Sequence, residues 1–76
     1  MKALVSFLAK ALVDNPELVQ VEEHEKDDVI VEVLRVAKDD LGKVIGKQGS
    51  TAKAIRTLLA SAALNREKKC KLEIIE

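Results

Sequence analysis

Residues 41–51 read LGKVIGKQGST, an apolar stretch that breaks at two glycines and then resumes. The leucine, valine and isoleucine before the break fit a short helix over Leu41–Ile45. The small and hydroxyl side chains after it fit the start of a longer helix that runs to about Leu64. Gly46 and Gly49 carry no Cβ, so the backbone between the helices can turn sharply. The stretch predicts two helices joined by a tight loop.

Side chains at the start of each helix indicate how that helix begins. Asp39 or Asp40 can cap the first helix. Ser50 or Thr51 can cap the second, because a side-chain oxygen can accept a bond from a free backbone N–H group. Gly42 lies inside the first helix, where it costs about 1 kcal/mol relative to alanine. A glycine in this place indicates close approach by another backbone or by a ligand.

The longer helix carries one apolar stripe, which we expect to be buried. Its members recur three or four positions apart, as residues on one helix face do, and they are Ile55, Leu58, Leu59 and Ala62. Asn65 is the predicted C-terminal stop, and Arg66 lies favourably near the negative end of the helix.

Three segments outside this helical pair have the composition of β-strands. Leu18–His24 alternates apolar and polar residues, and residues 25–27 form a polar turn. Asp28–Val36 is rich in β-branched residues with apolar side chains on both faces, which is typical of a central strand. Lys69–Ile75 alternates again. The first two strands should form an antiparallel hairpin, and the helical crossover should make the second and third parallel neighbours.

An amphipathic helix precedes the strands and ends at Asp14-Asn15-Pro16, because a residue before proline is pushed out of the helical region. Its apolar positions follow the helical period and are expected to be core: Leu4, Phe7, Leu8, Ala11 and Leu12. The alternative is that Phe7 or Leu8 reaches a dimer interface.

Together these elements predict an α+β fold with the order α-β-β-α-α-β. Three helices should pack on one face of a three-stranded mixed sheet and leave the other face more open. The 76 residues suit a single domain over positions 1–76, and no repeat or interdomain linker interrupts them.

Composition and charge narrow the function classes. Charged residues make up 34% of the chain, and no apolar run approaches the roughly 20 residues of a membrane span. Lys10 and Asp14 interrupt the N-terminal apolar stretch, which argues against a signal peptide and predicts a cytoplasmic protein. The net charge is zero, yet residues 1–40 carry five cations against ten acids, and residues 41–76 carry eight against three. The basic second half suggests a face that binds an anion.

Two residues with reactive side chains receive structural interpretations. Cys70 is the only cysteine, so it forms no internal disulfide, and we expect a small buried hydrophobe rather than a reactive thiol. His24 lies among acidic residues and is expected to be a solvated turn histidine. The sequence therefore predicts no catalytic residue, metal site, cofactor or small-molecule substrate, and the protein is not expected to be an enzyme.

Cations surround the glycine loop on both sides. One lies a turn before the loop, one at its tip and two after it: Lys43, Lys47, Lys53 and Arg56. Free N–H groups at the start of the following helix, near Ser50 and Thr51, favour an anion. This combination predicts a corner that binds phosphate.

Apolar residues beside this corner are expected to line a groove along the sheet edge: Val44, Ile45, Ala52 and Ile55. Bases of a single strand can lie in such a groove with their Watson–Crick edges accessible, while phosphates pass the loop. Phe7 is the only aromatic residue, which argues against a binding surface built on stacked aromatic rings.

Val44-Ile45-Gly46-Lys47-Gln48-Gly49 resembles the Ile-Gly-x-x-Gly signature of KH domains, and the element order resembles their type II, prokaryotic arrangement. The likeness covers essentially the whole chain, whose size is similar to that of small stand-alone bacterial KH proteins. It implies that the loop from Gly46 to Gly49 clamps the backbone of about four nucleotides of single-stranded RNA, supported by Val44 and Ile45. It also implies an RNA chaperone that forms a homodimer or pairs with a larger KH-containing protein, with a link to cell-envelope growth and cell shape.

Two other motifs fit less well. A P-loop needs two glycines separated by four residues and then lysine and a hydroxyl residue. Here Gly42 and Gly46 are separated by three residues, and Gln48 follows Lys47. A helix-turn-helix would use residues 50–64 as its recognition helix, which offers few bidentate base readers and leaves the sheet unexplained.

A second hypothesis is a protein-interaction or dimerisation subunit of an RNA-binding complex, with weak RNA contact of its own. Small size and neutral total charge favour it, because a small domain gains binding surface by pairing.

Overall fold

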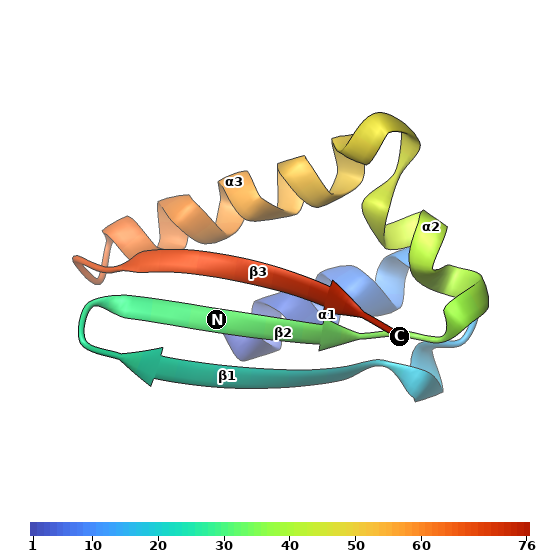
Figure 1. Ribbon diagram of the computed structural model, residues 1–76, viewed down its shortest axis with the longest axis horizontal. Coiled ribbons are helices and arrows are strands. Elements are labelled where there is room, and N and C mark those ends of the chain that lie inside the picture. The colour runs from blue at the N-terminus through green and yellow to red at the C-terminus, as the bar shows by residue number, and fades with distance from the viewer.

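A computed structural model describes residues 1–76 and contains the predicted elements in the predicted order (Figure 1). The helices and strands are α1 (Lys2–Leu12), β1 (Gln20–Lys26), β2 (Val29–Arg35), α2 (Leu41–Ile45), α3 (Ser50–Leu64) and β3 (Lys69–Ile75). Short 3₁₀ turns lie at Pro16–Leu18, Lys38–Asp40 and Lys47–Gly49. No helix is long and apolar enough to cross a membrane.

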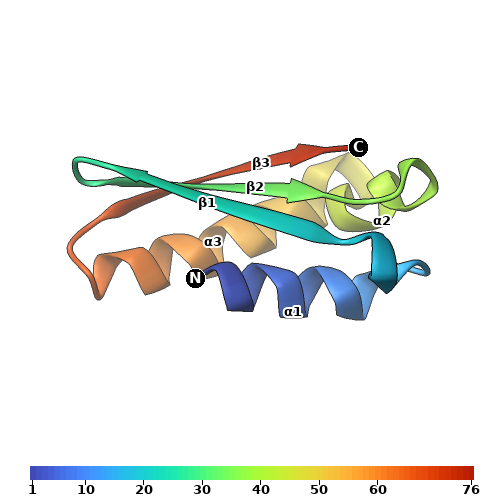
Figure 2. The same ribbon diagram turned by 90° about the horizontal axis from the view of Figure 1, so that it is seen from below.

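The sheet has the order β1-β2-β3, which confirms β2 as the central strand. β1 and β2 are antiparallel and joined by a turn at Asp27-Asp28, whereas β2 and β3 are parallel. Figure 2 shows the two layers, with the sheet on one side and α1 and α3 on the other. The sheet therefore has one face covered by helices and one helix-free face, as the sequence predicts.

β2 supplies the centre of the core because its side chains alternate across the sheet. Ile30, Glu32 and Leu34 are buried beneath the helices, whereas Val29 and its alternate neighbours are only half-buried on the helix-free face. The main apolar cluster joins all the larger elements and consists of Val5, Ala9, Val21, Leu34, Val36, Val44, Ile55, Leu59 and Leu72.

The predicted stripe of α1 is wrong in part. The fully buried positions are Val5 and Ala9, while Leu4 and Leu8 pack only at the margin of the core. Phe7 is 70% exposed and Ala11 and Leu12 are exposed. Small side chains at the contact let the helix axis come close to the sheet, which turns the bulkier stripe away from the centre.

The buried face of α3 is rotated relative to the predicted stripe, in the same direction as that of α1. Ile55 and Leu59 are buried as predicted, but Leu58 is 50% exposed and Ala62 is only half-buried. Ala52 and Ala63 complete the buried face instead. Alanine is favoured there because it lets α3 approach the sheet closely.

The predicted helix caps are right only in part, because Asp40 occupies the N-cap position of α2 but its side chain forms no capping bond. Neither α2 nor α3 has a side-chain cap, and Gly49 occupies the N-cap position of α3. α3 ends at Leu64 with Asn65 as its C-cap residue, as predicted, and the positive φ of 57° that follows lies at Glu67. The N–H of Lys68 then bonds the Ala63 carbonyl at 2.9 Å, which satisfies the last turn and directs the chain into β3.

Asp40 is buried and acts as a clamp between segments. Its carboxylate accepts bonds from the backbone N–H groups of Asp14 (3.2 Å) and Asn15 (3.0 Å) and from the Asn15 side-chain amide (3.0 Å). Burial alone would raise the pKa of Asp40, but these bonds outweigh it and hold the pKa below its ordinary value. The clamp fixes the end of α1 against the start of α2, the helix that leads into the glycine loop.

Candidate functional site

The loop between α2 and α3 has an unusual backbone. Gly46 ends α2 with φ 77° and ψ 173°, and Gln48 and Gly49 follow with φ values of 57° and 76°. The Gly46 N–H still bonds the Gly42 carbonyl at 2.8 Å, and the Gly49 N–H bonds the Gly46 carbonyl at 3.1 Å. Positive φ is readily accessible to glycine, so the two glycines make this tight reversal possible.

The two glycines are required for different reasons. A Cβ on Gly46 would lie 2.7 Å from the Thr51 Cβ and 2.8 Å from the Thr51 backbone nitrogen, so any side chain there would collide. A Cβ on Gly49 or Gly42 would meet nothing within 4 Å. Gly49 is therefore favoured by its φ alone. The expectation that another part of the backbone approaches Gly42 is wrong, and its surface is open.

Polar side chains around the loop line a shallow hollow of about 440 Å³ at the start of α3. The lining residues are Lys47, Gln48, Ser50, Lys53, Ala54 and Thr57. Neither Lys47 nor Lys53 forms an ion pair with a carboxylate. Two uncompensated ammonium groups therefore face solvent beside the positive end of a helix, an arrangement that favours phosphate.

Lys43 does not join that hollow, although the sequence places it one turn before the loop. Its ammonium bonds the Asp14 carboxylate and lies 3.9 Å from the Asp40 carboxylate. The hydrogen bond to Asp14 is the main cause that raises the pKa of Lys43. Its charge is therefore largely compensated, and Lys43 belongs to the clamp.

The apolar residues expected to line a groove lie deeper than predicted. Val44, Ala52 and Ile55 are buried in the core, so they support the loop from beneath and offer little surface to a ligand. Ile45 is 36% exposed and is the member of the set with accessible surface. Short apolar helices beside a sheet are covered by it, and periodicity alone does not distinguish a groove wall from a core position.

Further cations on β3 were missed by the sequence reasoning. Lys69 and Lys71 form no ion pair, and neither does Arg56 on α3. The alternation of β3 was a sufficient signal, because it places both lysines on the strand face opposite Leu72. Arg66 and Lys68, in contrast, pair with Glu25 at 3.5 and 2.6 Å.

The predictions for Cys70 and His24 are confirmed in part, because Cys70 is less buried than expected and the exposed His24 lies within β1 rather than in a turn. Cys70 is half-buried, and burial raises the pKa of its thiol, which disfavours the reactive thiolate. The His24 side chain is 65% exposed and lies 3.4 Å from the Glu22 carboxylate. Acidic, cysteine and histidine side chains form no cluster suited to a metal ion.

Comparison with known proteins gives one consistent result. Residues 2–74 match the family model described as KhpA/KhpB, KH domain. An RNA-binding protein KhpA of Caldanaerobacter subterraneus is 55% identical, with 99% of this chain and 100% of the relative covered. Proteins of the same name from Clostridium perfringens (52% identical; 99% and 100% covered) and Chlamydia trachomatis (49%; 100% and 97%) are also similar. No solved structure matches the chain.

Proposed function

The chain belongs to the KhpA/KhpB family of KH domains, and we propose from that premise that it binds single-stranded RNA at the corner formed by Gly46–Gly49 and the start of α3. The curated relatives carry the name of RNA-binding proteins, which supports RNA as the ligand class. The observation that carries the assignment to this corner is a tight loop with a glycine at each end, next to two ammonium groups without carboxylate partners.

The corner suits a sugar-phosphate backbone more than a base. The open surfaces of Gly42 and Gly49 let a phosphate approach the main chain closely. Lys47 and Lys53 then supply point charges on either side of the α3 N-terminus. Contacts of this kind fix the position of the strand without reading its sequence.

Exposed apolar area for bases is small near the loop. Ile45 contributes some, whereas Val44 and Ile55 hold the loop from within the core. Without an aromatic side chain at the corner, stacking adds little to binding there. We therefore expect moderate affinity, weak sequence preference and strong dependence on salt.

The test is RNA binding by a Lys47→Glu, Lys53→Glu variant, measured by fluorescence anisotropy with a labelled oligouridine. Both side chains are exposed and unpaired, so the variant should remain folded by circular dichroism while its affinity falls by more than about tenfold. The matched control is Lys2→Glu, Lys10→Glu on α1, which changes the net charge equally at exposed positions away from the loop. Equal losses in the two variants would reject the corner as the site.

A second role, self-association or pairing with another KH-containing chain, is favoured by one observation. Phe7 on α1 and Leu58 on α3 expose 70% and 50% of their surfaces, although most large apolar residues of this fold are covered. Sedimentation velocity across micromolar concentrations, with Phe7→Ser beside the wild type, tests this role. A wild-type monomer at every concentration would reject self-association, and a dimer weakened by Phe7→Ser would support it.

A further inference from the structure

The helix-free face of the sheet has a regular composition that the strand register fixes. Across the three strands, Lys26, Val29 and Lys69 form one row of neighbours. The next row toward the sheet centre has the same kind of composition, with His24, Val31 and Lys71. Residues in register point to the same side of a sheet, so each row places a valine between two nitrogen-bearing side chains.

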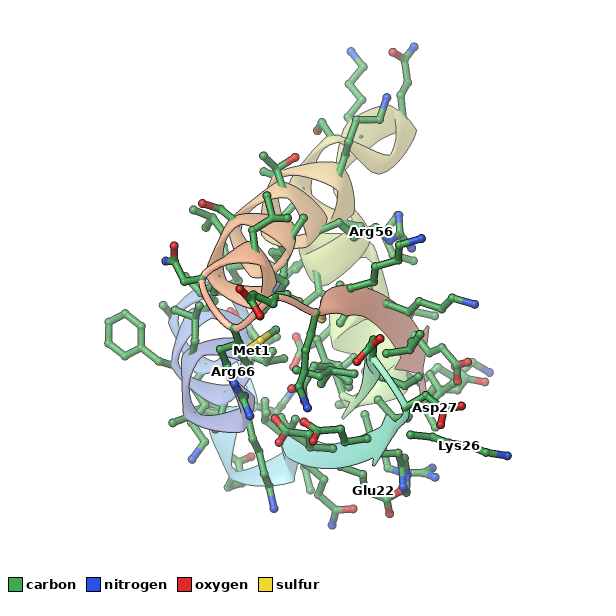
Figure 3. All side chains as sticks on the ribbon, turned by 90° about the vertical axis from the view of Figure 1, so that its left-hand side faces the viewer. Met1, Glu22, Lys26, Asp27, Arg56 and Arg66 are labelled. Carbon is green, nitrogen blue, oxygen red and sulfur yellow. The ribbon has the colours of Figure 1, made fainter.

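A third row marks where this pattern ends. Glu22, Val33 and Glu73 stand side by side there, so the nitrogen-bearing half of the face gives way to an acidic line. Opposite charges are thus sorted by row, with the basic half at the hairpin end. Figure 3 looks toward that end and shows Lys26 and Asp27 on the helix-free side, away from Met1 and Arg66.

The basic half is also hollowed. A depression of about 380 Å³ is lined by His24, Lys26, Asp27, Val29 and Val31. The floor is apolar and half-buried valine, and Asp27 is the one acid in the lining. Lys26 lines the depression, Lys69 and Lys71 are the β3 neighbours of its two valines, and none of the three lysines has an ion-pair partner.

This half of the face lies at the hairpin end of the molecule, whereas the glycine loop lies at the other end of α3 (Figure 1). α3, which begins at the glycine loop, makes most of its strand contacts with β3, the edge strand that carries Lys69 and Lys71. Arg56 of α3 extends beside β3 on the same side of the molecule as Lys26 (Figure 3). Arg56 lies farther along α3 than Lys47 and Lys53 and has no ion-pair partner, so an RNA strand that reaches both sites can meet a further cation between them.

We propose that this hollow on the helix-free face is a second contact surface for the same RNA strand, in which a base packs on Val29 and Val31 while phosphates meet Lys26, Lys69 and Lys71. The inference rests on RNA binding at the glycine corner and extends the footprint beyond that loop. An apolar floor surrounded by ammonium groups matches a flexible strand, which alternates flat apolar bases with anionic phosphates.

Charge favours RNA over a second copy of the chain as the occupant. Lys26 and Asp27 balance each other in the lining, and the unpaired Lys69 and Lys71 on the neighbouring strand β3 add positive charge beside it, which suits a polyanion. A second copy would have to bring its own acidic row, Glu22 and Glu73, onto these lysines, and Val33 separates the two acids. A self-association that depends on those acids is the competing outcome.

The experiment compares two oligouridines, one limited to the roughly four nucleotides that a loop of this kind clamps and one about three times longer. The variant is Lys26→Ala, Lys69→Ala, Lys71→Ala, and the control is Lys2→Ala, Lys10→Ala, Lys38→Ala, which removes the same charge at exposed positions off this face. Affinities are measured over a series of salt concentrations, with circular dichroism as the folding check.

We expect the face variant to bind the short RNA within about twofold of the wild type and the long RNA about tenfold more weakly, with the magnitude of its salt slope reduced by about 2. The control should bind both RNAs like the wild type. Unchanged long-RNA affinity, or equal losses in variant and control, would overturn the proposal. The proposal would also be overturned if a Glu22→Ala, Glu73→Ala variant bound the long RNA as weakly as the face variant does and also lost a dimer that sedimentation detects for the wild type. Failure of the wild type to bind either RNA would instead refute the corner itself.

Discussion

Two acidic side chains are buried in this small fold, and they differ in almost every other respect. Asp40 is held by three hydrogen bonds at the junction of α1 and α2. Glu32 lies in the middle of β2 beneath the helices, and neither of its carboxyl oxygens has a hydrogen-bond partner. Burial is the main cause that raises the pKa of Glu32, to about 8, and the nearby Glu23 carboxyl raises it further. Burial is thus tolerated in one case by bonds to the charged form and in the other by retention of the proton.

The comparison teaches that the same burial can support a site or weaken the fold. Asp40 lies in the connection that leads into the glycine loop, and its hydrogen bonds compensate the free-energy cost of burying its carboxylate there. Glu32 faces Glu23 across the β1–β2 pair, and Glu23 in turn accepts a bond from the Lys2 N–H at 3.1 Å near the start of α1. Nothing comparable satisfies Glu32 itself. Substitution of Asp40, of Glu32 or of Lys43, which lies near Asp40, should therefore have different effects on stability.

Asp40→Ala should have the largest effect. It leaves the backbone N–H groups of Asp14 and Asn15 without their acceptor and removes a carboxylate near Lys43. We expect the melting temperature to fall by about 15 °C, because one kcal/mol corresponds to about 4–8 °C in a chain of this size. Thermal unfolding followed by circular dichroism measures it. A melting temperature within two or three degrees of the wild type would show that the clamp is dispensable.

Glu32→Gln should stabilise the protein, and only above a defined pH. The folded-state pKa of about 8 lies above the unfolded value of 4.5, so between these limits the unfolded state alone loses its proton. Wild-type stability should therefore fall as pH rises from about 4.5 to 8 and level off above 8. The variant lacks this loss and should be more stable than the wild type by several kcal/mol at pH 8, while matching it near pH 4.

Urea unfolding of the wild type and of Glu32→Gln at a series of pH values tests that expectation. The two stability curves should diverge with rising pH. Curves that stay parallel from pH 4 to pH 9 would mean that Glu32 is ionised in the folded state or hydrogen-bonded in solution. Asp40→Asn is the matched comparison, because Asp40 has a lowered pKa and its contribution should disappear only as pH falls below about 4.

Lys43→Met should have the smallest effect. The substitution keeps the apolar stem and removes an exposed charge that is compensated by Asp14. The melting temperature should change by no more than about 3 °C, and RNA affinity should remain within about twofold of the wild type. Lys47→Met, which removes an uncompensated charge, should lower affinity several-fold in the same assay. Equal losses at the two lysines would show that RNA displaces Asp14 from Lys43.

Much of the fold could be predicted because strands and loops have strong local signals. The alternation of Lys69–Ile75 was sufficient to predict β3, and Gly46 was sufficient to predict the break between α2 and α3. The crossover rule then predicted that β2 and β3 are parallel. The buried face of α1 was missed because apolar residues occupy more than one side of that helix, so periodicity alone did not choose Val5 and Ala9 over Phe7.

The candidate site was predictable in its loop and less so in its charges. The lysines look alike in the sequence, and only the folded chain shows that Lys43 meets Asp14, which is distant along the chain. The burial of Glu32 was predictable, since its spacing from Ile30 and Leu34 places it on the core side of β2. The hydrogen bonds of Asp40 were not predictable, because its partners in the Asp14-Asn15 turn are brought to it only by packing.

The mixed sheet also orders the steps of folding in time. Lys26 meets Val29 across a two-residue turn, whereas Val29 meets Lys69 only after the whole α2–α3 crossover has closed. Closing the longer loop costs more chain entropy, so the hairpin should assemble first and the docking of β3 should limit the rate. Until then Ile30 and Leu34 have an unpaired strand edge beside them. The brief lifetime of that open edge, rather than the final stability, should decide how readily the chain aggregates while it refolds.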